Sequence, residues 1–91
     1  MTRKASKRWL ISGMVQGVGF RYFAQNKAHE LGVTGWARNL DDGRVEVYAA
    51  GTPKQLSDMA AAMHVGPRMA RVRGVEERDE AVQDLSGFSI R

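Results

Sequence analysis

Along this chain, the spacing of apolar residues alternates between the period of a strand and the period of a helix. Few folds have strands and helices in the order that this spacing predicts. Apolar residues recur with period two in strands and with period 3.6 in helices. The patterns predict, in chain order, a strand over 8–14, a helix over 21–31, strands over 33–40 and 44–49, a helix after Thr52, a strand over 69–75 and a short strand over 88–90. The sequence therefore predicts an α+β, ferredoxin-like β-α-β-β-α-β sandwich. It would have an antiparallel sheet, two helices on one face and a short C-terminal strand.

Turn and cap residues mark the boundaries of these elements. Gly32 follows the first helix, where a glycine commonly ends a helix. Residues 41–43, Asp-Asp-Gly, are typical of a hairpin turn. Thr52 can cap the second helix, with Pro53 in its first turn and Gln55 completing a capping box. Each predicted element thus has a local reason to begin or end.

The same spacing predicts which side chains form the core. Trp9 and Ile11 share one face of the first strand, and the third strand alternates between an inward and an outward face. The predicted core of the other elements is Phe20, Phe23, Leu31, Val45, Val47, Ala49, Leu56, Met59, Ala60 and Met63. Glu46 and Tyr48 are predicted to point outward. The polar segment 76–85 is predicted to be a loop.

Length and charge define the domain organisation and exclude several classes of protein. The 91 residues suffice for one domain, and the chain has no cysteine for a disulfide or a thiolate metal site. The net charge is +4, and part of it lies in a basic cluster from Arg3 to Arg8. Residues 1–7 are predicted to be a disordered basic tail and residues 8–91 a folded domain. No apolar run is long enough to span a membrane. The lack of cysteines favours a cytoplasmic location, and the size and composition suit a monomer.

A glycine-rich segment connects the first predicted strand to the first helix. Gly13, Gly17 and Gly19 precede Arg21, which stands where the helix begins. Glycine allows successive backbone N–H groups to face one centre, and the helix N-terminus adds unpaired donors. The guanidinium of Arg21 is suited to phosphate or carboxylate. The segment lacks the Lys-Ser/Thr ending of a P-loop and the G-x-G-x-x-G spacing of dinucleotide folds. As a generic pattern it therefore fits either an anion site of another type or a flexible connection with a solvent-exposed arginine.

Two sequence blocks resemble one known family. Residues 13–21, G-M-V-Q-G-V-G-F-R, resemble the acylphosphatase signature G-x-V-Q-G-V-x-F-R, and residues 35–39, G-W-A-R-N, resemble its G-W-V-x-N block. The likeness extends from about Trp9 to the C-terminal strand. The resemblance implies the same ferredoxin-like fold. It also implies hydrolysis of small acyl phosphates to a carboxylate and inorganic phosphate, without a metal or cofactor.

The resemblance also implies which residues act. Arg21 would bind the phosphate and Asn39 would orient the attacking water. The phosphate would lie against the segment formed by Val15, Gln16, Gly17, Val18, Gly19 and Phe20, with the Gln16 side chain in a supporting role. Asn39 can accept a hydrogen bond from water and donate one to phosphate, but it is not a base. The sequence names neither the physiological substrate nor the proton acceptor.

A binding module is the alternative reading. A basic ferredoxin-like domain could hold a phosphorylated ligand or RNA without turnover, and RNA binding would require exposed aromatic residues on the central strands. Val45, Val47 and Tyr48 do not form such a motif, so no nucleic-acid partner is expected. His29 and His64 lack further ligands at metal spacing.

Overall fold

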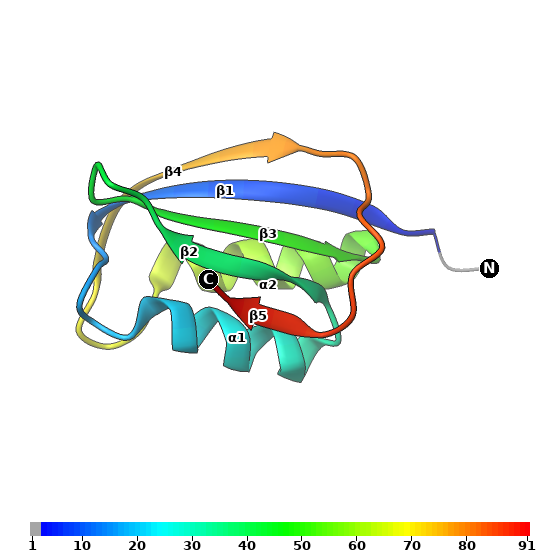
Figure 1. Cartoon of the computed structure of the whole chain (residues 1–91), viewed down its shortest axis with the longest axis horizontal. Coiled ribbons are helices and arrows are strands. Elements are labelled where there is room, and N and C mark those ends of the chain that lie inside the picture. Colours follow the sequence, from blue (N-terminus) through cyan, green and yellow to red (C-terminus); the bar gives the residue numbers. More distant parts are fainter. Residues whose placement is uncertain (1–2) are drawn as a thin grey trace.

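The computed structural model describes residues 3–91 and contains two helices and one five-stranded sheet (Figure 1). The elements are β1 (Ala5–Met14), α1 (Phe20–Leu31), β2 (Thr34–Asn39), β3 (Val45–Gly51), α2 (Pro53–Val65), β4 (Arg71–Asp79) and β5 (Phe88–Ile90). The strand order is β4-β1-β3-β2-β5. Both helices cover the same face of the sheet, which confirms the predicted α+β, ferredoxin-like class.

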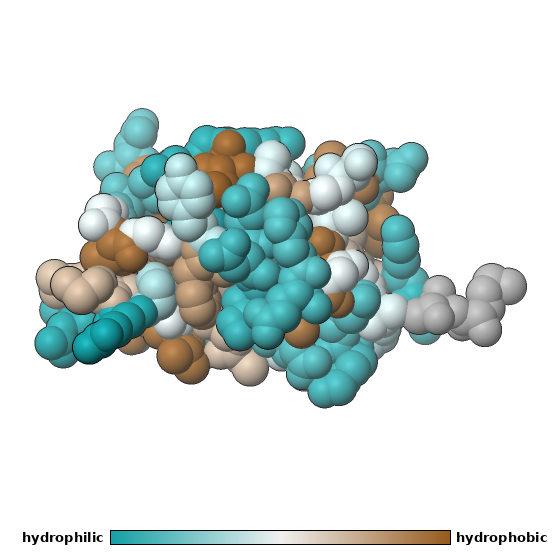
Figure 2. Space-filling model, turned by 90° about the horizontal axis from the view of Figure 1, so that it is seen from below, coloured by the Kyte–Doolittle hydropathy of each residue, from teal (hydrophilic) through white to brown (hydrophobic). Residues whose placement is uncertain are grey.

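The main core lies between the helices and the sheet. Trp9 and Ile11 of β1, which share one face of the strand, are fully buried. They pack with Val47 of β3, with Ala24 of α1 and with Met59 of α2. Burying one large apolar side chain contributes about 1.5–3 kcal/mol, so this layer supplies most of the driving force for folding. Seen from the helix side, the surface is largely hydrophilic with scattered apolar residues (Figure 2).

The helix boundaries follow from local chemistry. α1 lies between Gly19 and Gly32, whose φ angles of 78° and 80° are left-handed. Thr52 accepts a hydrogen bond from the Gln55 backbone at 3.1 Å, and the Gln55 side chain accepts one from the Thr52 N–H at 2.8 Å. The predicted capping box is thus confirmed. Neither helix in the described residues 3–91 has the length and hydropathy needed to cross a membrane.

The sheet is mixed rather than wholly antiparallel. β1–β3, β1–β4 and β2–β3 are antiparallel, whereas β5 pairs with β2 in parallel. Three of the four strand pairs are thus antiparallel, and the pairing of β5 with β2 is the exception. Residues 80–87 cross from β4 at one edge to β5 at the other, and this crossing brings β5 back in the direction of β2.

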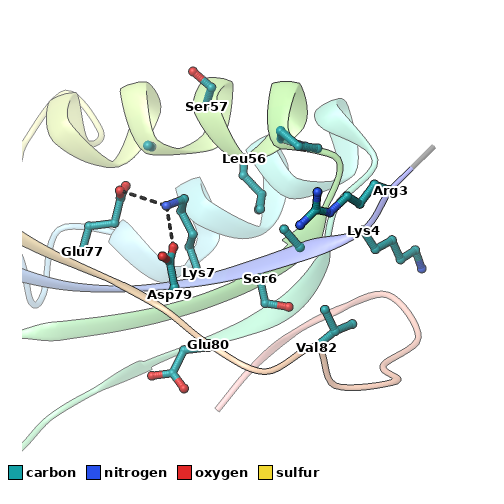
Figure 3. Close-up of a pocket in the computed structure, with 13 residues that line it drawn as sticks. Arg3, Lys4, Ser6, Lys7, Leu56, Ser57, Glu77, Asp79, Glu80 and Val82 are labelled. Atoms are coloured by element: carbon teal, nitrogen blue, oxygen red, sulfur yellow. Dashed lines mark hydrogen bonds and ion pairs between the residues drawn. The ribbon is translucent and has the colours of Figure 1, made fainter.

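The boundary predicted for the N-terminal tail is too late in the sequence. β1 begins at Ala5, and Ala5 to Lys7 pair with β3. The Lys7 ammonium lies 2.8 Å from an Asp79 oxygen and 3.2 Å from a Glu77 oxygen (Figure 3). A basic cluster that is neutralised by carboxylates on a neighbouring strand can join the sheet. Residues 1 and 2 of the predicted tail lie outside the described part of the chain.

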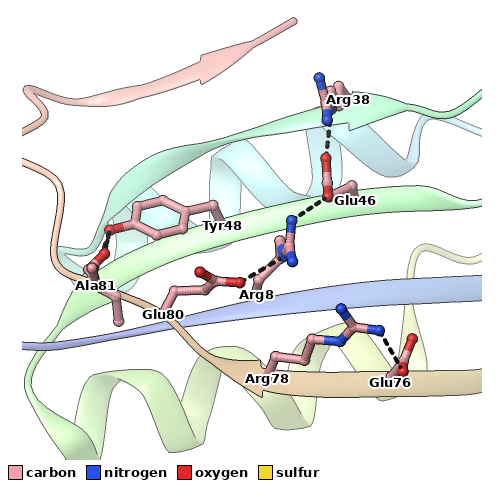
Figure 4. A network of polar contacts seen from close by, with 9 residues as sticks. Arg8, Arg38, Glu46, Tyr48, Glu76, Arg78, Glu80 and Ala81 are labelled. Carbon is pink, nitrogen blue, oxygen red and sulfur yellow. Dashed lines mark hydrogen bonds and ion pairs between the residues drawn. The ribbon is translucent and has the colours of Figure 1, made fainter.

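The face of the sheet opposite the helices is also partly buried. Tyr48 and Glu46 point away from the helices as predicted, yet only 1% and 3% of their surface is exposed. Arg8 and Arg38 both donate to the Glu46 carboxylate, and the Tyr48 hydroxyl lies 3.0 Å from the Ala81 carbonyl oxygen (Figure 4). The same hydroxyl accepts a hydrogen bond from the Gln83 backbone at 2.7 Å. The segment after β4 thus covers this face.

β4 is longer than predicted. It continues to Asp79, so the first four residues of the predicted loop 76–85 belong to the strand. Glu77 on this strand accepts a hydrogen bond from the buried Trp9 indole at 2.8 Å. This bond, with the Lys7 contact, holds the pKa of Glu77 below its usual range.

Glu77 therefore links stability to acidic pH. A carboxylate with a depressed folded-state pKa stabilises the fold above its unfolded pKa, here about 4.5, and loses that contribution as pH falls through the folded pKa. In Glu77→Gln we expect a smaller loss of unfolding free energy below pH 4.5 than in the wild type. Denaturant titrations from pH 3 to 7, about 0.5 pH units apart, measure this. Identical pH slopes for the two proteins would contradict it.

Candidate active site

The connection from β1 to α1 presents backbone donors to one small region. Gly17 and Gly19 have φ angles of 73° and 78°, which favour glycine. Gly19 is the N-cap of α1 and has no side chain to cap it. The first bond of the helix joins the Phe23 N–H to the Gly19 carbonyl at 3.0 Å. The preceding N–H groups at 20–22 have no helical partner and carry the positive end of the helix dipole.

Sheet topology brings the second predicted block to the same region. β1 and β2 are both antiparallel to β3, which lies between them, so β1 and β2 run in the same direction. Their C-terminal ends therefore meet at one end of the sheet. The glycine-rich loop follows β1, and Asn39 is the final residue of β2. Residues that are distant in sequence thus become neighbours.

A pocket of about 130 Å³ lies where these two ends meet. Its walls are Val15, Gly17, Gly19, Phe20, Arg21, Tyr22 and Asn39. The structure therefore places Arg21 and Asn39 in one cavity with most of the predicted loop. The side chains of Gln16 and Val18 are not part of the wall. Val18 packs against the core, and Gln16 is bonded to the β2–β3 hairpin.

The Arg21 guanidinium is held from the side of β5. Its Nη1 donates to the backbone oxygen of Arg91 at 3.0 Å. Arg91 in turn donates its N–H to the carbonyl of Ala37 in β2 at 2.8 Å. One guanidinium nitrogen is thus used for orientation, and the remaining N–H groups are available to a ligand. This chain of bonds ties Arg21 to the strand that ends in Asn39.

Two residues at the site were missed by sequence reasoning. Tyr22 lines the pocket and is 66% exposed. Its place directly after Arg21, in the first turn of the helix, was the available signal. Arg91 contributes a backbone oxygen, which any residue type can supply, so no side chain or motif pointed to it.

One of the two acidic residues in the β2–β3 turn is bonded within the turn itself. Asp42 accepts hydrogen bonds from the Arg44 side chain and backbone, at 2.9 and 3.1 Å. The Arg44 side chain thereby holds the pKa of Asp42 below its usual range. This is the turn role expected for Asp42. Across residues 3–91, no three histidine or carboxylate side chains gather as a metal-binding group.

A larger cavity, of about 620 Å³, lies at the other end of β1 (Figure 3). It is bounded by the residues that begin β1, by the N-terminal half of α2 and by the end of β4. Lys7 in its wall is already paired with two carboxylates. The small pocket combines glycine-loop donors with an arginine that has no carboxylate partner in the described residues, so it is the better candidate for an anion.

Comparison with known protein sequences identifies the family of this chain. The sequence model of the Acylphosphatase family matches residues 7–90. A curated protein named acylphosphatase from Solibacter usitatus is 55% identical over 86 residues, covering 94% of this chain and 90% of that protein.

Two solved structures of acylphosphatases have the same fold as this chain. The structure of an acylphosphatase from Coxiella burnetii superposes with a TM-score of 0.93 at 36% identity and covers 97% of this chain and 93% of that one. The crystal structure of acylphosphatase from Bacillus subtilis gives 0.92 at 35% identity and covers 96% and 98%. Both comparisons span nearly the whole of each chain. The chain is therefore an enzyme that belongs to the acylphosphatase family.

Proposed function

We propose that this protein hydrolyses the carboxyl–phosphate bond of small acyl phosphates at the pocket between the glycine-rich loop and the end of β2. The observation that supports this most strongly is the presence of Arg21, the loop backbone and Asn39 around one cavity. The products would be a carboxylate and inorganic phosphate. Phosphate release from a small acyl phosphate tests the proposal, and a folded protein without such activity would contradict it.

Arg21 and the loop would bind the phosphoryl group. The free N–H groups at the start of α1 can donate to phosphate oxygens, and the guanidinium adds a fixed positive charge. Phosphoryl transfer depends mainly on positioning and on stabilisation of charge. These donors would therefore hold the substrate and also stabilise the negative charge that accumulates in the transition state.

Asn39 would orient the nucleophile. Its side-chain oxygen can accept a hydrogen bond from water while its amide donates to a phosphate oxygen. The water oxygen would then attack phosphorus as the bond to the acyl oxygen breaks and a carboxylate leaves. A carboxylate is a good leaving group, so this reaction needs no strong general base. The water's proton would pass to the phosphate.

Metal independence forms part of the proposal. The cavity wall contains no acidic side chain, and its charge comes from Arg21. Such a wall attracts an anion and repels a divalent cation. Phosphate charge would therefore be neutralised by the protein itself.

We expect inorganic phosphate to inhibit competitively and a chelator to leave turnover unchanged. The product anion should occupy the same backbone donors and the same guanidinium as the substrate phosphate. Initial rates at several substrate and phosphate concentrations, with and without chelator, measure both effects. Activity that is lost in chelator and restored by a divalent ion would contradict the metal-free mechanism.

RNA binding on the open face of the sheet is the less favoured function. Trp36 and Tyr48 on that face are 7% and 1% exposed, so neither ring is open for a base to stack on. Arg38 and Arg91 lie over the Trp36 ring, at 5.3 and 4.8 Å from its centroid. The monomeric state and the cytoplasmic location stay predictions from composition.

A further inference from the structure

The side chain of Gln16 joins the two walls of the pocket. Its Nε2 donates to the carbonyl of Leu40 at 2.7 Å and to the carbonyl of Arg44 at 3.0 Å. A primary amide has two N–H groups, so both bonds can form together. Gln16 belongs to the glycine-rich loop, and Leu40 directly follows Asn39. The amide therefore connects the phosphate-binding segment to the backbone that carries Asn39.

The carbonyls of Leu40 and Arg44 lie where the strands of the β2–β3 hairpin meet its turn, which we call the neck of the hairpin. The Leu40 N–H donates to the Arg44 carbonyl at 2.8 Å, and the Asn39–Val45 pair comes directly before this bond. Asn39 itself is exposed, as are residues 41–43 of the turn. Val45 on β3 is buried in the core, but the residues from Asn39 to Gly43 are not, so polar bonds to the neck carry more weight in positioning Asn39.

We propose that Gln16 is a positioning residue, which sets the distance between the phosphate-binding loop and Asn39 without contacting the phosphate. This inference rests on the proposed function of the same pocket. Its side chain is directed at the hairpin and is not part of the pocket wall. Catalysis that relies on orientation is sensitive to small displacements of a water-orienting group, whereas a bound phosphate is held by Arg21 and the loop backbone.

The test is a double-mutant cycle with Asn39. Steady-state kinetics and phosphate inhibition constants are measured for the wild type, Gln16→Ala, Asn39→Ala and the double variant. We expect Gln16→Ala to lower kcat by about ten- to a hundredfold and to change the phosphate inhibition constant by less than about threefold. In the Asn39→Ala background, Gln16→Ala should have almost no further effect, because it acts through Asn39.

Two further variants separate positioning from general destabilisation. Gln16→Met keeps a side chain of similar length without donors, and we expect it to behave as Gln16→Ala does. Gln55→Ala is the matched control, because the Gln55 side chain also donates to a backbone carbonyl, that of Leu31, at 2.9 Å. It ties α2 to the end of α1 and lies outside the pocket wall. Its kcat should stay near that of the wild type. Thermal unfolding and circular dichroism establish that each variant is folded.

Three outcomes would overturn the role of Gln16 in an active enzyme. One is a folded Gln16→Ala with unchanged kcat. Another is a phosphate inhibition constant that rises in step with the loss of kcat, which would assign Gln16 to phosphate binding. The third is a double variant whose losses multiply, which would make Gln16 independent of Asn39. An inactive wild type would instead overturn the proposed function, and the Gln16 inference with it.

Discussion

Arg21→Lys is expected to lower kcat/KM for acyl phosphate hydrolysis by about a thousandfold, or about 4 kcal/mol, while the fold stays intact. Arginine can donate to the Arg91 oxygen with one nitrogen and still direct its other N–H groups at a phosphate. Lysine has a single nitrogen and no planar fork. It would have to give up either its orientation or part of its contact with the phosphate.

Turnover and far-UV circular dichroism of Arg21→Lys are measured together. Arg68→Lys is the matched control, because Arg68 is exposed in the connection between α2 and β4 and lies outside the pocket wall. The control should retain the wild-type rate. A folded Arg21→Lys protein that keeps a tenth or more of the activity would remove Arg21 from the central role.

Asn39→Ala is expected to reduce kcat by about a hundredfold or more, which corresponds to about 3 kcal/mol. Phosphate affinity should change little, since we propose that Arg21 and the loop backbone hold the anion. A group that acts mainly in the transition state lowers the catalytic constant more than ground-state binding. Asn39→Asp should in addition weaken phosphate binding, because it places a carboxylate in an anion site.

These effects are measured from kcat and the phosphate inhibition constant of each variant. Asn26→Ala, on the exposed side of α1, controls for the loss of an asparagine side chain. Near-normal turnover in Asn39→Ala, or a phosphate affinity that falls in step with the rate, would show that Asn39 does not orient the water.

Much of the fold could be predicted because its signals are local. The shared face of Trp9 and Ile11 follows from period two in β1, and the capping box of α2 follows from residues 52–55. The glycine-rich segment predicted a connection between the first strand and the first helix, and Gly17 and Gly19 in it have positive φ angles. Asn39 was predicted only from the family signature. It lies beside the loop because β1 and β2 run in the same direction on either side of β3.

The features that sequence reasoning missed depend on distant partners. β1 begins at Ala5 rather than Arg8, and Lys7 within it bonds to Asp79, 72 positions away. The burial of Tyr48 depends on the segment after β4, which a polar composition predicted to be only a loop. No period or motif in the sequence encodes such pairings.

The hydrogen bond between Arg21 and Arg91 spans 70 positions of the chain. A partly folded chain could form the glycine-rich loop and the β2–β3 hairpin before β5 docks. The guanidinium of Arg21 would then lack its hydrogen bond to Arg91 and would not be held in one orientation. Loop closure over such separations is slow relative to local turns. Recovery of hydrolysis during refolding would therefore follow the docking of β5, while circular dichroism would already register most of the helix. In this small enzyme, activity would thus return only in the last step of folding, after most of the secondary structure has formed.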